Sequence, residues 1–263
     1  MVDSRVDPDH GYISHFHEGP MHPPLFHTGD PRRNQLLASL PDADWARWQP
    51  QLERVVLRRG DVLCKSGTTP AHLCFPTTAI VSLLHATHDG DSAEIAVVGH
   101  EGMVGISLFM GGGFMTGDAV VQSTGQGFRL NAQAVADEAH RGGPVLSILL
   151  RYTQTLIEHV AQTAVCNRHH SIDQQLCRRL LLGLDRSPSD ELLMTQESLA
   201  GLLGVRREGV TAAAYKLQLA GVISYRRGRI DVLDREQLQK RACECYATAG
   251  AASHHRPSAM AIG

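Results

Sequence analysis

The chain has 263 residues, of which 43% are hydrophobic, and a formal net charge of −2. This length supports two modest domains with buried cores, and the near-zero charge excludes a protein that coats nucleic acid through an overall positive charge. There is no apolar run of about eighteen residues and no basic-then-apolar N-terminal signal, so we expect neither a membrane span nor export. The six cysteines are scattered through a chain too large to need disulfides, which favours a reduced, cytoplasmic protein.

Residues 1–33 are rich in Pro, Gly, Asp and His, and we expect them to form a flexible leader. Five histidines lie within it: His10, His15, His17, His22 and His27. A histidine tract can bind metal, but histidines mixed with prolines and polar residues more often form a disordered arm. At the other end, residues 247–263 have no periodic pattern and are expected to be a disordered tail.

Residues 34–142 are expected to form a sensor domain built mainly of strands. Two short helical pieces open it, one from Asn34 to Leu40 and one from Asp44 to Leu52. Short apolar runs separated by turn residues then predict strands at Glu53–Leu57, Arg59–Cys64, His72–Phe75, Ala79–His85, Ala93–Val98, Ala119–Gln122 and Gly127–Leu130. Asp89-Gly90 predicts a two-residue hairpin turn. This spacing is typical of a small antiparallel barrel or roll.

Residues 143–170 predict one long helix, with Pro144 in its first turn. Apolar and small residues recur along it at helical spacing: Val145, Leu149, Tyr152, Leu156 and Thr163. We interpret them as a seam that pairs with the same helix of a second copy. The alternative is that they pack only on the chain's own strands. A separate helix containing Ile172 and Leu176 follows, so we expect a hinge near Asn167–Ser171.

Residues 171–246 carry the most informative pattern, two short helices followed by a hairpin. Thr195 is a good N-cap for the first helix, and Gly204 ends that helix where a positive φ is cheap. The second helix opens with Arg206-Arg207-Glu208, and its apolar positions are Val210, Ala213, Ala214 and Leu217. β-Branched residues on both sides of Gly228 then predict a hairpin with arginines around its tip. A helix that reads DNA enters the major groove with its first turns facing the bases.

The charge of this segment supports the same interpretation. Residues 192–235 contain seven Lys or Arg and four Asp or Glu, a net charge of +3. Phosphate contacts supply most of the non-specific affinity for DNA, so a local positive charge matters. The candidate DNA-binding residues are Thr195, Gln196, Arg206, Arg207, Glu208, Thr211, Lys216, Arg226, Arg227 and Arg229. The alternative is a helical hairpin with a solvated basic edge.

The segment resembles the winged helix-turn-helix of the Crp/Fnr superfamily of bacterial transcription regulators, and the strands before it resemble the family's cyclic-nucleotide-binding β-roll. The resemblance implies an α+β fold with an N-terminal antiparallel β-roll, a long dimerisation helix and a C-terminal winged helix-turn-helix. It also implies a homodimer on a palindromic DNA operator, with RNA polymerase as a possible further partner. The family's recognition helix commonly carries Arg-Glu-x-x-x-Arg, which Arg207-Glu208 match until Ala212 takes the third position. The resemblance therefore implies base contacts by Arg207 and Glu208, and phosphate contacts by Thr195, Gln196 and Arg206.

The region where the family holds a cyclic nucleotide departs from the pattern. Such proteins carry a Gly-Glu for the ribose and an Arg-Ser/Thr-Ala for the phosphate. Here Ile106 stands near the glutamate position, no Lys or Arg lies between Glu101 and Gln122, and Asp118 would repel a phosphate. Gly111-Gly112-Gly113 could cradle an anion, although a flexible hairpin tip is favoured. We therefore expect no control by cyclic AMP or cyclic GMP.

The sequence indicates no cofactor and no enzymatic activity, because it contains no nucleophile–base constellation, metal motif or P-loop. The first 63 residues lack cysteine, which argues against the family's N-terminal iron–sulfur centre. Cys243 and Cys245 fall on an expected helix starting near Asp234, where they would point about 200° apart and could not share a metal ion. His100 and His159 could bind haem, but their spacing singles out neither. The alternative function is a ligand- or metal-binding sensory protein whose helix-turn-helix-like unit contacts another protein.

Overall fold

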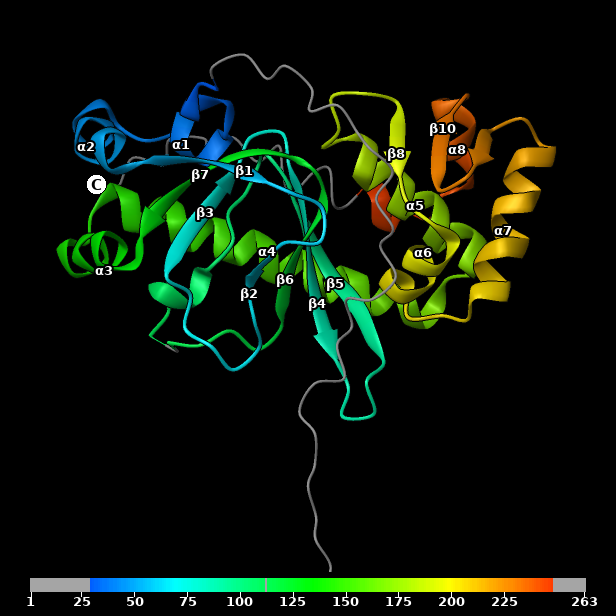
Figure 1. Ribbon diagram of the computed structural model, residues 1–263, viewed down its shortest axis with the longest axis horizontal. Coiled ribbons are helices and arrows are strands. Elements are labelled where there is room, and N and C mark those ends of the chain that lie inside the picture. The colour runs from blue at the N-terminus through cyan, green and yellow to red at the C-terminus, as the bar shows by residue number, and fades with distance from the viewer. Residues whose placement is uncertain (1–28, 112, 248–263) are drawn as a thin grey trace, which may run out of the picture.

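The structure is a computed structural model that describes residues 29–111 and 113–247 (Figure 1). Residues 1–28 of the predicted leader and 248–263 of the predicted tail lie outside the described residues. The chain enters through η1 (Pro31–Arg33), so the end of the predicted leader is already ordered into a 3-10 turn. It continues with α1 (Gln35–Ala38), α2 (Asp42–Trp48) and η2 (Gln49–Gln51).

Asn34 fixes this N-terminal section to the sheet domain. Its side-chain oxygen accepts hydrogen bonds from the N–H groups of Leu36 and Leu37, which confirms the predicted N-cap. Its amide donates to the carbonyl oxygens of Pro76 at 2.9 Å and Gly102 at 2.8 Å. The side chain is fully buried, and these four bonds explain why a polar group is tolerated there.

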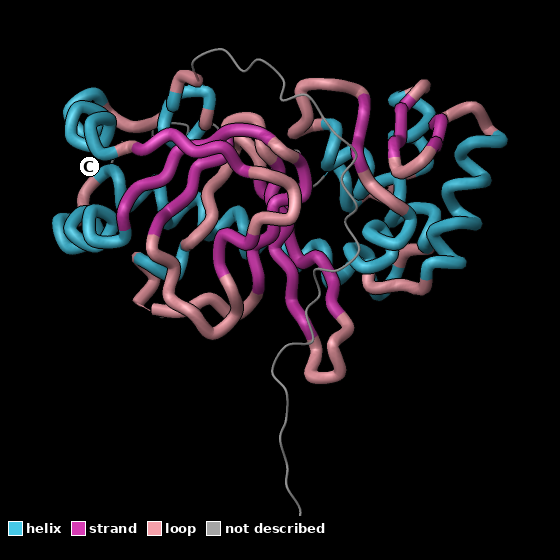
Figure 2. The backbone as a smooth tube through the Cα atoms, in the orientation of Figure 1, coloured by secondary structure: helices cyan, strands magenta, loops and turns pink. Residues whose placement is uncertain are grey.

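Seven strands form the N-terminal domain, as predicted. They are β1 (Glu53–Leu57), β2 (Val62–Cys64), β3 (His72–Pro76), β4 (Ile80–Ala86), β5 (Ser92–Val98), β6 (Asp118–Ser123) and β7 (Gly125–Asn131). All pairings are antiparallel, in one sheet of order β1-β7-β3 and another of order β2-β6-β4-β5. Figure 2 shows these strands curving around one another as a roll.

Two turns differ in detail from their predictions. β2 begins only at Val62, because Arg59-Gly60-Asp61 form the turn after β1 and Gly60 has a φ of 89°. The β4–β5 hairpin turns around Asp89-Gly90, with a φ of 90° at Gly90, but its loop runs from residue 87 to 91. The N–H of Thr87 donates to the carbonyl of Asp91 at 2.7 Å and closes this longer loop. The predicted two-residue turn was therefore wrong in length and right in position.

Two helices complete the roll, α3 (Ala132–Arg141) and the long α4 (Pro144–His169). The face of α4 that we expected to pair with a second copy instead faces the chain's own roll. Val145, Leu149 and Leu156 are buried in its core, and the Tyr152 hydroxyl donates to the Met103 carbonyl at 3.1 Å. The predicted seam was therefore wrong, and packing on the chain's own strands was the correct alternative.

The second domain begins at the predicted hinge. Ser171 caps α5 (Ile172–Leu184) through a capping box with Gln174. The remaining elements are β8 (Glu191–Leu193), α6 (Gln196–Leu203), α7 (Arg207–Leu219), β9 (Ile223–Arg226), β10 (Arg229–Val232) and α8 (Arg235–Arg241). The strands form a sheet of order β8-β10-β9, of which β8 was not predicted. No helix in the described part of the chain is long and apolar enough to cross a membrane.

The C-terminal helix is shorter than expected. α8 ends at Arg241, and Ala242 takes an extended conformation with φ −73° and ψ 159°. Cys243 and Cys245 therefore lie beyond the helix, and the predicted 200° separation of their side chains does not apply. Both cysteines are buried.

Candidate DNA-binding interface

The turn between α6 and α7 is defined by caps at both ends of α6. The Thr195 hydroxyl accepts a hydrogen bond from the N–H of Ser198 at 3.0 Å, and the Ser198 hydroxyl is 2.9 Å from the N–H of Thr195. At the other end Gly204 takes a φ of 64°, and the N–H of Val205 donates to the Ala200 carbonyl at 3.0 Å. These bonds fix where α6 begins and where the turn to α7 starts.

α7 presents a polar face outward because its apolar stripe packs into the domain core. Val210, Ala213, Ala214 and Leu217 are buried, as predicted. The candidate contact residues on the other face are all exposed: Arg206, Arg207, Glu208, Thr211 and Lys216. Figure 1 shows α7 at the outer edge of the molecule, away from the roll. This exposed face is free to enter a groove of DNA.

Some of these side chains have partners within the domain. Thr211 donates to the side-chain oxygen of Gln196 at 2.7 Å and so joins the starts of α6 and α7. Arg207 lies 3.8 Å from Glu197, but both side chains are more than 60% exposed, so this ion pair is weak and easily exchanged for a ligand. Lys216 pairs with Asp173 on α5 at 2.7 Å, and its side chain is also more than 60% exposed.

The wing is a two-residue hairpin with Arg227 and Gly228 at its tip. Their φ angles of 48° and 81° correspond to a type I′ turn. A left-handed conformation costs an arginine about 1 kcal/mol, and Asn would fit more cheaply. The fold therefore holds a cation at the tip despite this cost.

The three wing arginines, for which the same role was predicted, are not equivalent in the structure. Arg229 pairs with Glu191 on β8 at 3.0 Å. In the part of the chain that the structure describes, no carboxylate lies within ion-pair distance of Arg226 or Arg227. These two cations are therefore the ones available to phosphate.

The wing and the first turns of the two helices share one surface. A Cβ built on Gly228 would lie 3.3 Å from the methyl group of Thr195. Burial raises the pKa of the Tyr225 phenol on β9, while a backbone hydrogen bond from Gln196 and the charge of Arg207 oppose that rise. The wing therefore lies beside the N-termini of α6 and α7, where the predicted contact residues begin.

The charged groups near the expected cyclic-nucleotide site of the roll already have partners within the chain. Asp118 accepts a hydrogen bond from the N–H of Ser66 at 2.7 Å. Arg129, a possible substitute cation, forms a bidentate pair with Glu53 at 2.8 and 2.9 Å on the outside of the roll. Gly111 and Gly113 have positive φ angles and open space around them, whereas residue 112 lies outside the described residues. Their loop joins η3 (Ile106–Leu108) to β6, and β6 does not pair with the preceding strand β5, so the expected hairpin tip was wrong.

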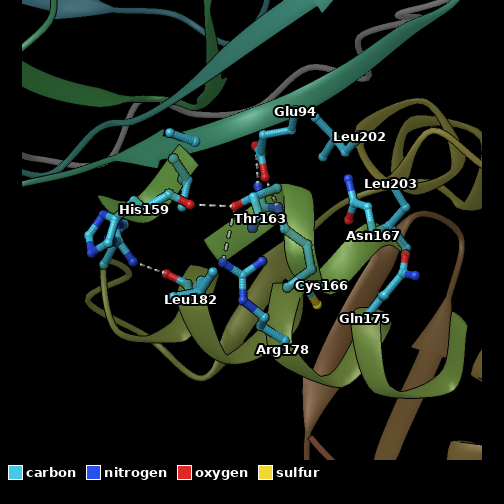
Figure 3. Close-up of a pocket in the computed structure, with 14 residues that line it drawn as sticks. Glu94, His159, Thr163, Cys166, Asn167, Gln175, Arg178, Leu182, Leu202 and Leu203 are labelled. Carbon is cyan, nitrogen blue, oxygen red and sulfur yellow. Dashed lines mark hydrogen bonds and ion pairs between the residues drawn. The ribbon is translucent and has the colours of Figure 1, made fainter. Parts of the chain in front are cut away.

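A set of charged residues lies between the two domains and was not predicted from the sequence (Figure 3). Arg179 on α5 donates to Glu94 on β5 at 3.0 Å, and Arg186 donates to Glu101 at 2.7 Å. Arg178 donates to the Thr163 hydroxyl on α4 at 3.1 Å. All three arginine side chains are buried. The available signal was Arg178-Arg179 within the mainly apolar run from Leu176 to Leu184, where a charge requires a partner.

Comparison with known proteins agrees with this architecture. Residues 54–141 match the family model of the cyclic nucleotide-binding domain, and residues 174–241 match that of the Crp-like helix-turn-helix domain. A search of curated protein sequences finds no match to the chain.

Solved structures share the fold at low sequence identity. A Crp/Fnr-family transcriptional regulator from Eubacterium rectale matches with a TM-score of 0.65 and 18% identity, over 80% of this chain and 98% of its own. FixK2 from Bradyrhizobium japonicum matches with a TM-score of 0.61 and 15% identity, over 73% of this chain and 98% of its own. A CRP-family transcriptional regulator from Thermus thermophilus matches with a TM-score of 0.61 and 18% identity, over 72% of this chain and 96% of its own. Two matched domains in this order, on this fold, place the chain in the Crp/Fnr superfamily of transcription regulators.

Proposed function

We propose that the protein binds a palindromic DNA operator as a homodimer, with α7 in the major groove and the wing on the phosphate backbone. The observation that carries this proposal is the shared surface formed by the exposed start of α7 and the unpaired cations Arg226 and Arg227. Arg207 would bind guanine through two hydrogen bonds, and Glu208 would accept one from cytosine. Thr195, Gln196 and Arg206 would contact phosphates. The same proposal places the protein in the cytoplasm, with RNA polymerase as the partner beside its operator.

An exposed stripe on α4 supports dimerisation, although not through the residues first expected. Leu150, Ile157 and Val165 are large hydrophobic side chains that are 45%, 54% and 49% exposed. Their spacing of seven and eight residues keeps them on one side of the helix, opposite the face that packs on the roll. A second α4 would cover this stripe and would place two copies of α7 on the two halves of a palindrome.

We further propose that cyclic nucleotides do not control this regulator. A buried phosphate needs a cationic partner, and residues 102–121 contain none. Arg129 is paired with Glu53, and Asp118 would add a repulsive charge. The effector of the roll would then be a ligand without phosphate or a contact with another protein.

The direct test is selection of bound DNA from a random pool by the purified full chain. We expect enrichment of an inverted repeat, bound with an affinity that falls steeply with salt because phosphate contacts release counterions. Fluorescence anisotropy on the enriched site and on a scrambled site of equal length would measure this dependence. No enriched sequence, together with a flat salt dependence, would instead favour the alternative in which the helix-turn-helix contacts a protein.

A further inference from the structure

Four potential metal ligands meet where α4 ends and the C-terminal segment returns to it. They are Cys166, His170, Cys243 and Cys245, and their ligand atoms all lie within 4.8 Å of one another. Cys166 and His170 are four residues apart at the end of α4, so they share one face of the helix. Cys243 and Cys245 reach them because α8 stops at Arg241. The three cysteines are buried, and His170 is partly buried.

Two separations in this cluster are close to those of a tetrahedral zinc centre, and all of them lie within 4.8 Å. With Zn–S bonds of about 2.3 Å and a Zn–N bond of about 2.0 Å, a tetrahedron places two sulfurs about 3.8 Å apart and a sulfur and a nitrogen about 3.5 Å apart. The Cys166 and Cys243 sulfurs are 3.6 Å apart, and the Cys245 sulfur is 3.5 Å from Nδ1 of His170. Three thiols and one imidazole are also a common ligand set of structural zinc sites.

The neighbouring groups are arranged as the outer groups of metal centres usually are. Nδ1 of His170 faces the sulfurs, and its Nε2 lies 3.2 Å from the carboxylate of Glu244. A carboxylate on the far nitrogen orients a histidine ligand and makes it a stronger donor to the metal. The amide of Gln162 on α4 donates to the Cys245 sulfur at 2.8 Å, as suits a negatively charged thiolate.

Contacts of Tyr246 with both domains hold the C-terminal segment, and therefore its cysteines, in position. Tyr246 packs against Ile80, Val97 and Leu182, residues from both domains. Its hydroxyl is 3.2 Å from Asp185 and accepts a hydrogen bond from Arg235. In Figure 1 this last described segment, drawn in red, lies at the junction between the domains rather than beside the wing.

We propose that Cys166, His170, Cys243 and Cys245 bind one Zn²⁺ ion, which ties the end of α4 to the C-terminal end of the DNA-binding domain. Both sides of the hinge at residues 167–171 would then be held by the same ion. The site is independent of the DNA-contact residues on α7 and the wing. A disulfide is the competing use of these thiols, and the 3.6 Å between the Cys166 and Cys243 sulfurs exceeds a covalent S–S bond of about 2.05 Å.

The test is the metal content and Co²⁺ spectrum of the untagged full chain, purified under reducing conditions. We expect about one zinc per chain by elemental analysis. Co²⁺ added to the metal-free protein should give thiolate charge-transfer absorption and the intense visible bands of a tetrahedral site. The leader histidines could also take up Co²⁺, but without thiolate absorption, so the spectrum separates the two sources.

Matched variants assign the ligands. Cys166→Ala and Cys245→Ala should each lose the stoichiometric zinc and the thiolate bands. Cys177→Ala and Cys74→Ala, which change buried cysteines outside the cluster, should keep them. Circular dichroism would show whether each variant is folded. If a variant does not fold, the Co²⁺ spectrum of the wild-type protein still tests the proposal. Any of three results would overturn the proposal. They are the absence of thiolate bands when Co²⁺ is added to the metal-free protein, a Cys166–Cys243 disulfide in the reduced preparation, and zinc retained in both ligand variants.

Discussion

Arg179 of α5 and Glu94 of β5 form a buried ion pair between the DNA-binding domain and the roll, with only 3% and 7% of the two residues exposed. Glu94 also accepts a hydrogen bond from the Ser82 hydroxyl, and Arg179 donates to the Gln122 side chain. This pair joins the two domains, and removing either partner would leave the other buried without its counter-charge.

Breaking this pair from one side should destabilise the protein strongly. We expect Arg179→Met or Glu94→Gln to lower the free energy of unfolding by about 3–5 kcal/mol, because each leaves an uncompensated buried group. The double variant should be clearly less destabilised than the sum of the two single variants. Denaturant unfolding followed by circular dichroism would measure this, with Lys240→Ala of the exposed Lys240–Glu236 pair as a control that changes little. Simple additivity of the two changes would show that the pair contributes no coupling.

Removing Arg207 should relax sequence recognition. Its side chain is exposed at the start of α7 and forms a weak pair with Glu197. We expect Arg207→Ala to cost about 1–3 kcal/mol on the preferred operator and to relax one base position in each half-site. Anisotropy titrations on the operator and on single-base variants would measure both effects, and Arg141→Ala on α3 would serve as an exposed-arginine control. Equal weakening on every sequence would make Arg207 a phosphate contact instead.

Neutralising the wing should weaken binding to all sequences alike. We expect Arg226→Gln combined with Arg227→Gln to reduce the slope of log K against log salt by about 0.9 for each phosphate that the wing no longer neutralises. Arg229→Gln should have a smaller effect, since that guanidinium already pairs with Glu191. The measurement is a salt series for wild type, the double variant and Arg229→Gln. An unchanged slope in the double variant would remove the wing from the interface.

A charge on the exposed stripe of α4 should separate the proposed dimer. Ile157→Glu would place a carboxylate in a contact between two α4 helices, where desolvating it is costly. We expect light scattering to show a monomer and the affinity for a palindromic site to fall. Val56→Glu, on an equally exposed hydrophobic residue of β1, should remain dimeric. A dimeric Ile157→Glu variant would place the interface on another face.

Cyclic AMP and cyclic GMP should neither bind the roll nor alter DNA binding, because residues 102–121 supply no cation for the phosphate. Calorimetric titration of the purified protein with micromolar to millimolar nucleotide would measure binding to the roll. Fluorescence anisotropy with and without nucleotide would measure any effect on DNA binding. Two arginines could turn into the site, Arg129 on β7 and Arg151, which is exposed on α4. Micromolar binding that disappears in Arg129→Ala or in Arg151→Ala would show that the substituted arginine does so.

The sequence predicted local features well, because they are set by near neighbours. The caps at Asn34, Thr195 and Gly204 are formed by residues within a turn of the helices they bound, and each was placed correctly. The strands alternate with turn residues, which fixed their order and approximate ends.

Contacts between residues far apart in the sequence could not be predicted from such local patterns. Apolar residues occur as adjacent pairs on α4, Leu149 with Leu150 and Leu156 with Ile157, so periodicity could not say which face meets the roll. Glu94 and Arg179 are 85 residues apart, and no local pattern joins them. The end of α8 carries neither Gly nor Pro after Arg241, so nothing marked the extended backbone at Ala242 that brings Cys243 and Cys245 to α4.

The turn between α6 and α7 also limits how freely this DNA-binding domain could be exchanged with that of a relative. A Cβ on Gly204 would lie 3.2 Å from the methyl group of Ala93 on β5, next to the pair formed by Glu94. The turn that orients α7 is thus fitted to the surface of this particular roll. Grafting residues 171–246 onto another regulator would transfer the side chains proposed to read bases but not the surface against which their turn packs. We therefore expect a working chimera to need residues that match Ala93 and Glu94 as well.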